Sequence, residues 1–167
     1  MPRIDFDALP EHGRMWVFPL KRRLAADEAT AVLDVVDDFL NGWAAHGMPL
    51  RSGRRLVDDH FLLVGVDVDA EAPSGCSIDA LVGQLRTLGA RLGTTFVDHA
   101  PVWYRSTEGI RAVSRPDFKR LAAEGSVDVD TAVFDTSLTK MSEAALLERP
   151  AAESWHGRAF FQGSEQG

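Results

Sequence analysis

The sequence predicts an α+β fold: a ferredoxin-like βαββαβ sandwich, with two helices on one face of an antiparallel sheet, plus a C-terminal extension. Two observations predict it. Two long segments carry apolar residues at three- and four-residue steps, the spacing of an amphipathic helix. Shorter β-prone segments flank them up to residue 113, in the order strand, helix, strand, strand, helix, strand, which suits this fold and the right-handed crossovers that it favours.

We expect a single domain with three regions. Residues 1–14 are polar and form an N-terminal arm, residues 15–113 form the ferredoxin-like core, and residues 114–167 pack on that core as an extension of helix and strand. With 167 residues, 45% of them hydrophobic, the chain is long enough to bury one core without disulfides or metals.

The first strand is expected over residues 15–20, where Pro19 limits it to an edge or a strand end. The helix that follows has Asp27 and Glu28 in its first turn and Gly47 after its end. Its apolar stripe consists of Ala29, Val32, Leu33, Val36, Phe39, Leu40 and Trp43.

Two strands are expected next, over residues 51–58 and 60–68, joined at a polar tip. The second of them is apolar on both faces, which is typical of a central strand. The second helix is expected to begin at Ile78, with Ser77 or Cys76 as its N-cap, and to end at Gly93.

The rest of the chain is less regular. Short β-prone pieces cover residues 94–97, 102–105 and 110–113, and Ser114 is a good N-cap for a short helix that ends at Gly125. A helical piece is expected near residues 141–147. A last segment with large rings should fold back, because these rings would otherwise form an exposed apolar patch; they are Trp155, Phe160 and Phe161.

Composition excludes some functions. The net charge of −7 repels phosphate backbones, so nucleic-acid binding is not expected. A lone cysteine forms no intramolecular disulfide, which indicates a cytoplasmic protein. The longest apolar run, residues 61–66, is too short to cross a bilayer, and no cofactor is expected. Homodimer formation through sheet edges or helices is a further expectation, common for small α+β units.

The only cysteine lies in a turn of small residues before the second helix, and this turn is the candidate site. A helix N-terminus has unpaired N–H groups and about half a positive charge. We therefore expect a module that binds a small anion or a partner. Its ligand-binding residues are Ser74, Gly75, Ser77 and Asp79, with an arginine such as Arg55, Arg51, Arg54 or Arg105 as the counter-charge.

Two other interpretations of the turn stay open. In the first, Cys76 is the nucleophile of a cysteine-dependent enzyme, with His46 or His60 as the general base. In the second, the turn is only a tight, well-capped loop in which Cys76 is a small buried filler. The sequence does not place either histidine beside the cysteine.

No metal site is expected. A structural zinc site needs four nitrogen or sulfur ligands at close spacing, and this chain has one cysteine and no two histidines closer than 14 positions. A hard-cation site would use acidic residues near His60, but a solvated hairpin tip is the favoured interpretation. The residues concerned are Asp58, Asp59, His60, Asp67 and Asp69.

Three stretches carry a resemblance to a known family: residues 43–50 (WAAHGMPL), residues 74–79 (SGCSID) and residues 151–156 (AAESWH). With them the chain resembles a family of small uncharacterised bacterial proteins that are often labelled "ABC transporter ATPase". The resemblance implies a bacterial protein and no functional residues. The label itself is inconsistent with the sequence, because such an ATPase needs a Gly-x4-Gly-Lys-Ser/Thr loop and the chain contains no Gly-Lys pair.

Overall fold

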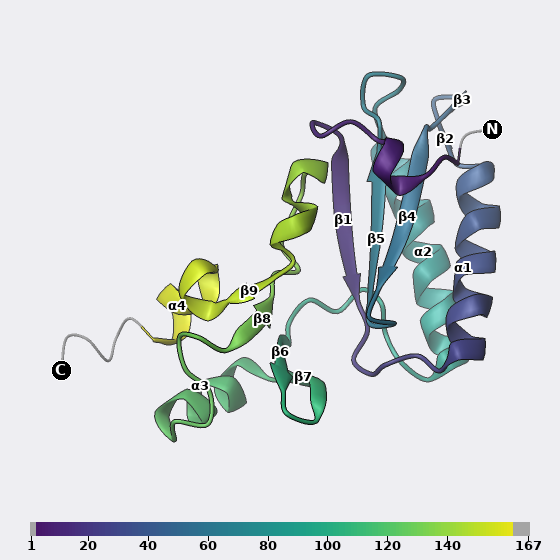
Figure 1. Ribbon diagram of the computed structural model, residues 1–167. Helices are drawn as coiled ribbons and strands as arrows, with labels where there is room; N and C mark the ends of the chain where they lie inside the picture. The colour runs from purple at the N-terminus through teal and green to yellow at the C-terminus, as the bar shows by residue number, and fades with distance from the viewer. Residues whose placement is uncertain (1–2, 162–167) are drawn as a thin grey trace. The chain divides into compact units, whose positions relative to one another are not determined.

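The computed structural model describes residues 3–161 and divides into two compact units, each with a sheet of its own (Figure 1). The first unit contains the residues up to Asp98 together with Ser137–Ala144, and the second contains His99–Thr136 and the residues from Ala145 onward. The chain thus divides after Asp98, where the sequence suggested a boundary after residue 113. The expected packing of residues 114–167 on the core stays a prediction.

The first unit has helices on one face of an antiparallel sheet, which confirms the α+β class (Figure 1). The sheet order is β1 (Arg14–Pro19), β5 (Phe61–Val66), β4 (Ser52–Val57). The helices are α1 (Ala26–Asn41) and α2 (Gly75–Leu92), whose apolar sides share one buried cluster with β1 and β5.

The complete ferredoxin-like sandwich is not confirmed, because its fourth strand is missing from this sheet in the described residues. Residues 94–97 form no strand. The Thr94 amide instead donates to the Gly89 carbonyl oxygen at 2.9 Å, which uses the chain after α2 to cap that helix. The next strand, β6 (Val102–Ser106), belongs to the sheet of the second unit.

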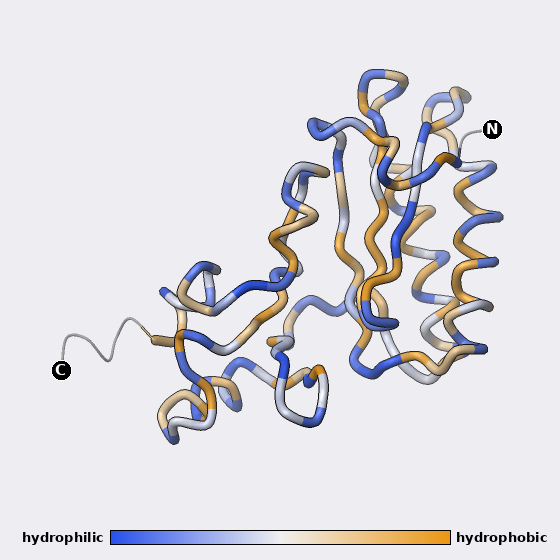
Figure 2. Tube along the Cα trace, viewed as in Figure 1, coloured by the Kyte–Doolittle hydropathy of each residue, from blue (hydrophilic) through white to orange (hydrophobic). Residues whose placement is uncertain are grey.

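The central strand β5 is buried at all of its positions, as its apolar run on both faces predicts. Leu62, Val64 and Val66 lie in the cluster with the two helices. The alternate residues point to the other face of the sheet, because successive side chains of a strand face opposite ways. Figure 2 shows this strand as a continuous hydrophobic run in the middle of the sheet.

The N-terminal arm packs on the face that the helices leave open. Its 3₁₀ helix η1 (Phe6–Ala8) is followed by Leu9, and both Phe6 and Leu9 are buried. The arm approaches the sheet backbone at Gly53, where an added Cβ would lie 2.7 Å from the Ile4 carbonyl oxygen. The arm is therefore part of the folded unit.

Between α1 and β4 the structure contains a hairpin that the sequence did not predict. Helix α1 ends at Asn41, two residues before Trp43, which we expected to be its last apolar residue. The chain then forms the short strands β2 (Ala44–Ala45) and β3 (Met48–Pro49), paired antiparallel.

The second unit is a four-stranded antiparallel sheet with short helices, and Phe118 is buried in its aromatic core. Ser114 caps the helix α3 (Arg115–Ala123) as predicted, since its hydroxyl oxygen accepts from the Asp117 amide at 3.1 Å. The expected fold-back of the last rings is confirmed within this unit, since Phe160 and Phe161 pack on Phe118 with ring centroids 4.9 and 6.1 Å away. The remaining elements of this unit are β7 (Gly109–Val113), β8 (Ala132–Phe134), β9 (Glu148–Pro150), η3 (Ala151–Glu153) and α4 (Trp155–Phe160). The 3₁₀ helix η2 (Met141–Leu146) begins in the first unit, which includes Ser137–Ala144.

A methyl group at Gly53 tests the close approach of the arm. We expect Gly53→Ala to lower the free energy of unfolding by about 1–3 kcal/mol, because backbone atoms of Ile4 and Phe6 would have to move. Gly83→Ala is the matched control: its Cβ meets nothing within 4 Å on helix α2, so it should raise stability by about 0.5–1 kcal/mol. Urea unfolding measures both, and equal stabilities for the two variants would contradict the arm's packing.

Candidate functional site

Helix α2 begins three residues earlier than the sequence suggested, and its N-cap is Ser74, not Ser77 or Cys76. The reason is a reciprocal pair of hydrogen bonds. The Ser77 amide donates to the Ser74 hydroxyl oxygen at 3.1 Å, and the Ser74 amide donates to the Ser77 hydroxyl oxygen at 2.7 Å. This is a capping box in which serine takes the place of the usual glutamate. Both hydroxyl groups are therefore committed to the helix start.

Two backbone donors remain at this helix end. The amides of Gly75 and Cys76, the first two of the 18-residue helix, have no hydrogen-bond partner within the described part of the chain. Cys76 is exposed, and Gly75 is exposed with open space where a Cβ would be. No acidic residue lies in the first turn to neutralise the positive end of the helix dipole. Asp79, the fifth residue of the helix, is exposed.

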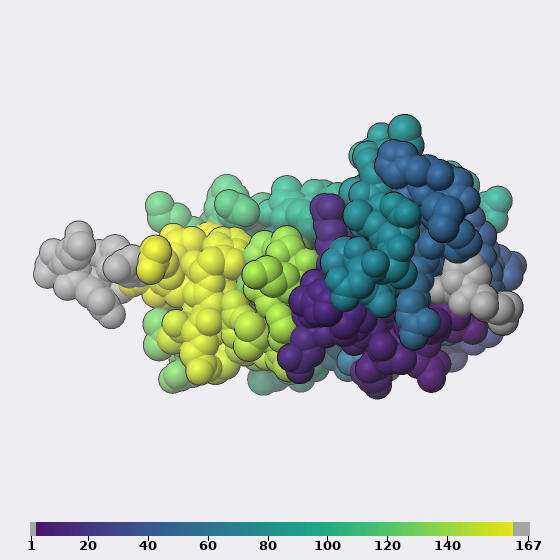
Figure 3. All heavy atoms as spheres, turned by 90° about the horizontal axis from the view of Figure 1, so that it is seen from above, coloured from purple at the N-terminus to yellow at the C-terminus, as the bar shows by residue number. Residues whose placement is uncertain are grey.

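The β2–β3 hairpin lies beside this helix end. The Trp43 indole N–H donates to the Ser77 carbonyl oxygen at 2.8 Å, a buried contact that fixes the hairpin base to the first turn of α2. Seen from this end of the unit, residues 43–50 (blue) and the segment that leads into α2 (teal) are side by side (Figure 3). His46 is exposed at the hairpin tip, so the structure brings His46 and Cys76 to the same end of the unit.

His60 does not belong to this site. It lies at the turn between β4 and β5, at the opposite end of the sheet from the start of α2, a strand length of about 20 Å away. The side chain is buried, and this burial lowers the pKa of His60. A neutral ring at that end of β5 is not placed to accept a proton from Cys76.

Arg55 is also separated from the turn. It lies on β4 and points to the face of the sheet opposite α2, where it forms an ion pair with Asp7 and lies over the Phe6 ring, 4.7 Å from the ring centroid. The structure therefore places this predicted counter-charge with the N-terminal arm. It does not bring it together with Ser74, Gly75 and Ser77.

The acidic residues that the sequence suggested for a cation site lie in two groups at opposite ends of β5. Asp58 and Asp59 lie with His60 at the β4–β5 turn, whereas Asp67 and Asp69 follow the other end of β5. There they meet His12, which the sequence did not single out: its Nε2 lies 2.5 Å from Asp69 Oδ2, and the ligand atoms of the three residues lie within 4.8 Å of one another. The group is largely exposed, and Arg51 lies 3.7 Å from Asp67.

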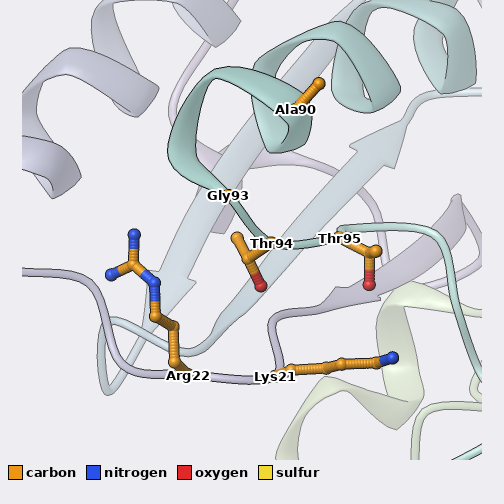
Figure 4. A pocket seen from close by; sticks show the side chains of 6 residues that line it. All are labelled: Lys21, Arg22, Ala90, Gly93, Thr94 and Thr95. Atoms are coloured by element: carbon orange, nitrogen blue, oxygen red, sulfur yellow. The ribbon is translucent and has the colours of Figure 1, made fainter.

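A cavity of about 460 Å³ lies at the other end of α2 (Figure 4). Lys21 and Arg22 reach along it from below, and the hydroxyl groups of Thr94 and Thr95 point toward them. Arg22 already binds Glu28 at 2.7 and 2.9 Å, which lowers the pKa of Glu28 to about 2.

The remaining charges in this cavity are also compensated. Arg22 donates to the Leu92 carbonyl oxygen at 2.7 Å, and Lys21 Nζ lies 3.2 Å from the Asp98 carboxylate. The C-terminal end of a helix carries negative partial charge, which opposes an anion. The α2 N-terminus is therefore the better anion site of the two helix ends.

The second unit contains a buried polar group around His156. The His156 Nδ1 lies 2.8 Å from the Ser154 hydroxyl oxygen, and the Trp155 ring stacks on the imidazole with 3.9 Å between centroids. Burial lowers the pKa of His156 to about 4, against a weaker opposite effect of the Asp135 carboxylate. Asp135 is itself buried and paired with Arg149 at 2.7 Å. The imidazole is therefore neutral near pH 7.

Comparisons of the chain with protein-family models, with curated proteins and with solved structures find no match. The family resemblance noted in the sequence therefore stays a prediction. Within residues 3–161, no helix combines the length and the apolar character that crossing a membrane requires.

The neutral His156 predicts a pH dependence of stability. Its pKa is about 4 in the folded chain and ordinarily 6.5, so the unfolded chain binds a proton in this window that the folded chain does not. Stability should fall as the pH drops from 6.5 to 4, by at most about 3 kcal/mol from this group. The measurement is urea unfolding at several pH values for the wild type and His156→Gln, which lacks this proton. Parallel pH profiles of the two proteins would show that His156 is not the cause.

Proposed function

We propose that the first unit binds a small anion, a phosphate or a carboxylate, at the N-terminus of α2. The amides of Gly75 and Cys76 are the proposed donors, and the single observation that carries the proposal is that these two N–H groups are unpaired at an exposed helix end. Backbone donors at the positive end of a helix dipole are a common anion site in proteins.

The state of the surrounding side chains determines how the anion would be held. Because the hydroxyl groups of Ser74 and Ser77 are engaged in the capping box, the ligand relies on backbone amides. Arg55 points to the other sheet face and supplies no counter-charge. We therefore propose a ligand of low charge that binds weakly, with Ser74 and Ser77 acting as positioning residues for the amides and Asp79 at the edge of the site.

A cysteine-dependent enzyme is the second candidate function. It is favoured by the exposed thiol of Cys76 and by the position of the β2–β3 hairpin, with His46 at its tip, beside the first turn of α2. In this proposal the thiol proton passes to the His46 imidazole, the thiolate sulfur adds to a carbonyl carbon of the substrate, and the electron pair of the C=O π bond moves to the carbonyl oxygen. His60 has no part in it, because of its distance from the turn.

Several wider proposals accompany these. The first unit is an incomplete ferredoxin-like sandwich, supported by its βαββα order and its β1-β5-β4 sheet. The protein is a cytoplasmic bacterial protein, supported by its single cysteine and by the family resemblance. It does not bind nucleic acid, which agrees with its net charge of −7. Homodimer formation through sheet edges is consistent with the strand order, and light scattering measures it.

Gly75→Pro tests the anion site by deleting one donor. Proline is well accepted as the first residue of a helix and lacks the N–H, and Ser74 has the extended backbone that precedes proline (φ −98°, ψ 167°). We expect this variant to bind inorganic phosphate about tenfold more weakly than the wild type, because a charge-assisted hydrogen bond is lost. The measurement is a titration of the Cys76 amide shift by NMR at constant ionic strength.

Gly75→Ala is the matched control, since it keeps the N–H and its Cβ meets nothing within 4 Å. It should bind phosphate as the wild type does. If the proline variant retains full affinity, or if the wild type shows no saturable shift of the amides, the anion proposal is wrong.

The enzymatic alternative predicts a reactive thiol that depends on the hairpin. Cys76 should react with iodoacetamide at pH 7 at least about tenfold faster than free cysteine, because in this proposal His46 accepts the thiol proton. His46→Ala should lower the alkylation rate of Cys76 to nearly that of free cysteine, and His60→Gln should leave the rate unchanged. Mass spectrometry of the alkylated peptide measures the rates. A wild-type rate equal to that of free cysteine rules out the nucleophile.

A further inference from the structure

A second cavity, of about 390 Å³, lies in the first unit at the free edge of β4. The N-terminal arm forms its rim. The backbone of Arg3 forms an isolated parallel β-bridge with Ser52, and the Ile4 amide donates to the Ser52 carbonyl oxygen at 2.7 Å. Three arginines line the cavity, Arg3 from the arm and Arg54 and Arg55 from β4. Its volume is in the range of small-molecule sites.

Two of these guanidinium groups share one carboxylate. Arg54 binds Asp37 of α1 through Nε and Nη2, both at 2.8 Å. The Arg3 Nε lies 3.6 Å from the same carboxylate and is buried without a hydrogen-bond partner in the described chain. The Asp37 carboxylate thus balances the charge of only one of these two arginines. The buried Arg3 N–H without a hydrogen-bond acceptor lowers the stability of the folded chain. Around Asp37 the two guanidinium groups therefore outnumber the carboxylate, while Asp5 and Asp7 add exposed negative charges elsewhere in the lining.

The third guanidinium group is held by a weaker partner. Arg55 pairs with Asp7, whose side chain is 82% exposed, and an ion pair in such a position contributes little stability. The Phe6 ring, 4.7 Å from the guanidinium carbon, supports Arg55 independently of that carboxylate. A ligand anion can therefore replace Asp7 without displacing Arg55.

Apolar side chains also line the cavity, together with the exposed carboxylates of Asp5 and Asp7. Phe6 is buried, and Leu33 of α1 and Leu56 of β4 are half-buried beside it. Such a surface would contact the organic part of a ligand, while the arginines face its charged end. A bare inorganic ion would leave it exposed to water.

We propose that this cavity binds a phosphate monoester with a small apolar body. A phosphate group offers three oxygens to planar guanidinium groups, which bind it in bidentate fashion. The proposal accounts for a cluster of arginines in a chain whose net charge is −7. It does not rest on the function proposed above, because it uses none of the residues at the start of α2.

Phenyl phosphate is the probe, and calorimetric titration of the full chain measures its affinity. We expect saturable one-to-one binding, weakened at least about tenfold in Arg55→Gln, which loses a charged donor but keeps a side chain of similar reach. Asp7→Asn should bind about two- to fivefold more tightly, because it removes the competing carboxylate. Inorganic phosphate should bind more weakly than phenyl phosphate to the wild type.

The opposite directions of the two variants separate a lost site from a lost fold, since a misfolded protein would not gain affinity. Gly75→Pro should leave phenyl phosphate affinity unchanged, which distinguishes this site from the start of α2. The proposal is overturned if phenyl phosphate does not saturate the wild type, or if Arg55→Gln and Asp7→Asn both bind as the wild type does. Equal affinities for phosphate and phenyl phosphate would likewise overturn the proposed apolar contact.

Discussion

The lack of side chains at two paired glycines is the constraint on which the first unit depends. Gly53 and Gly65 are directly opposite each other on β4 and β5, on the side of the sheet away from α1 and α2. A Cβ at Gly53 would lie 2.7 Å from the Ile4 carbonyl oxygen, and one at Gly65 would overlap the Met141 sulfur. The N-terminal arm and the segment around Met141 can therefore lie directly on the sheet backbone, so the face without helices is also covered.

The same close approach explains how both faces contribute to the arginine cavity. Because the arm passes over Gly53, Phe6 lies under Arg55 on the face away from the helices. Arg54, the preceding residue, points to the other face and meets Asp37 of α1. Consecutive side chains of a strand face opposite ways, so in the interior of a sheet they cannot line one cavity. At an edge strand such as β4 the two faces meet, and side chains from both can surround one ligand.

The sequence predicted those features of the fold that depend on neighbouring residues in the chain. Residues 61–66, which are apolar on both faces of the strand, indicated the central strand, and Gly93 marked the end of α2. The N-cap was misplaced because Ser74 and Ser77 form a nearly symmetric pair, and only the hydrogen bonds distinguish cap from first turn. The missing fourth strand and the position of Arg55 depend on tertiary contacts, namely the capping of α2 by Thr94 and the packing of the arm, and neither has a periodic signal.

Backbone strain does not decide between the two candidate functions at the start of α2. His46 has a positive φ of 53°, which is uncommon outside glycine, but Asp58 and Asp59 in the β4–β5 turn have values of 54° and 53°. Tight hairpin turns require such conformations at their central residues, so these angles report the turn type and not a strained site. Cys76 is exposed, and the contact between this helix turn and the hairpin is made by the Ser77 carbonyl oxygen, which accepts from the Trp43 indole N–H. The separation of the His46 imidazole from the Cys76 sulfur is therefore what distinguishes the proposed nucleophile from the proposed anion site.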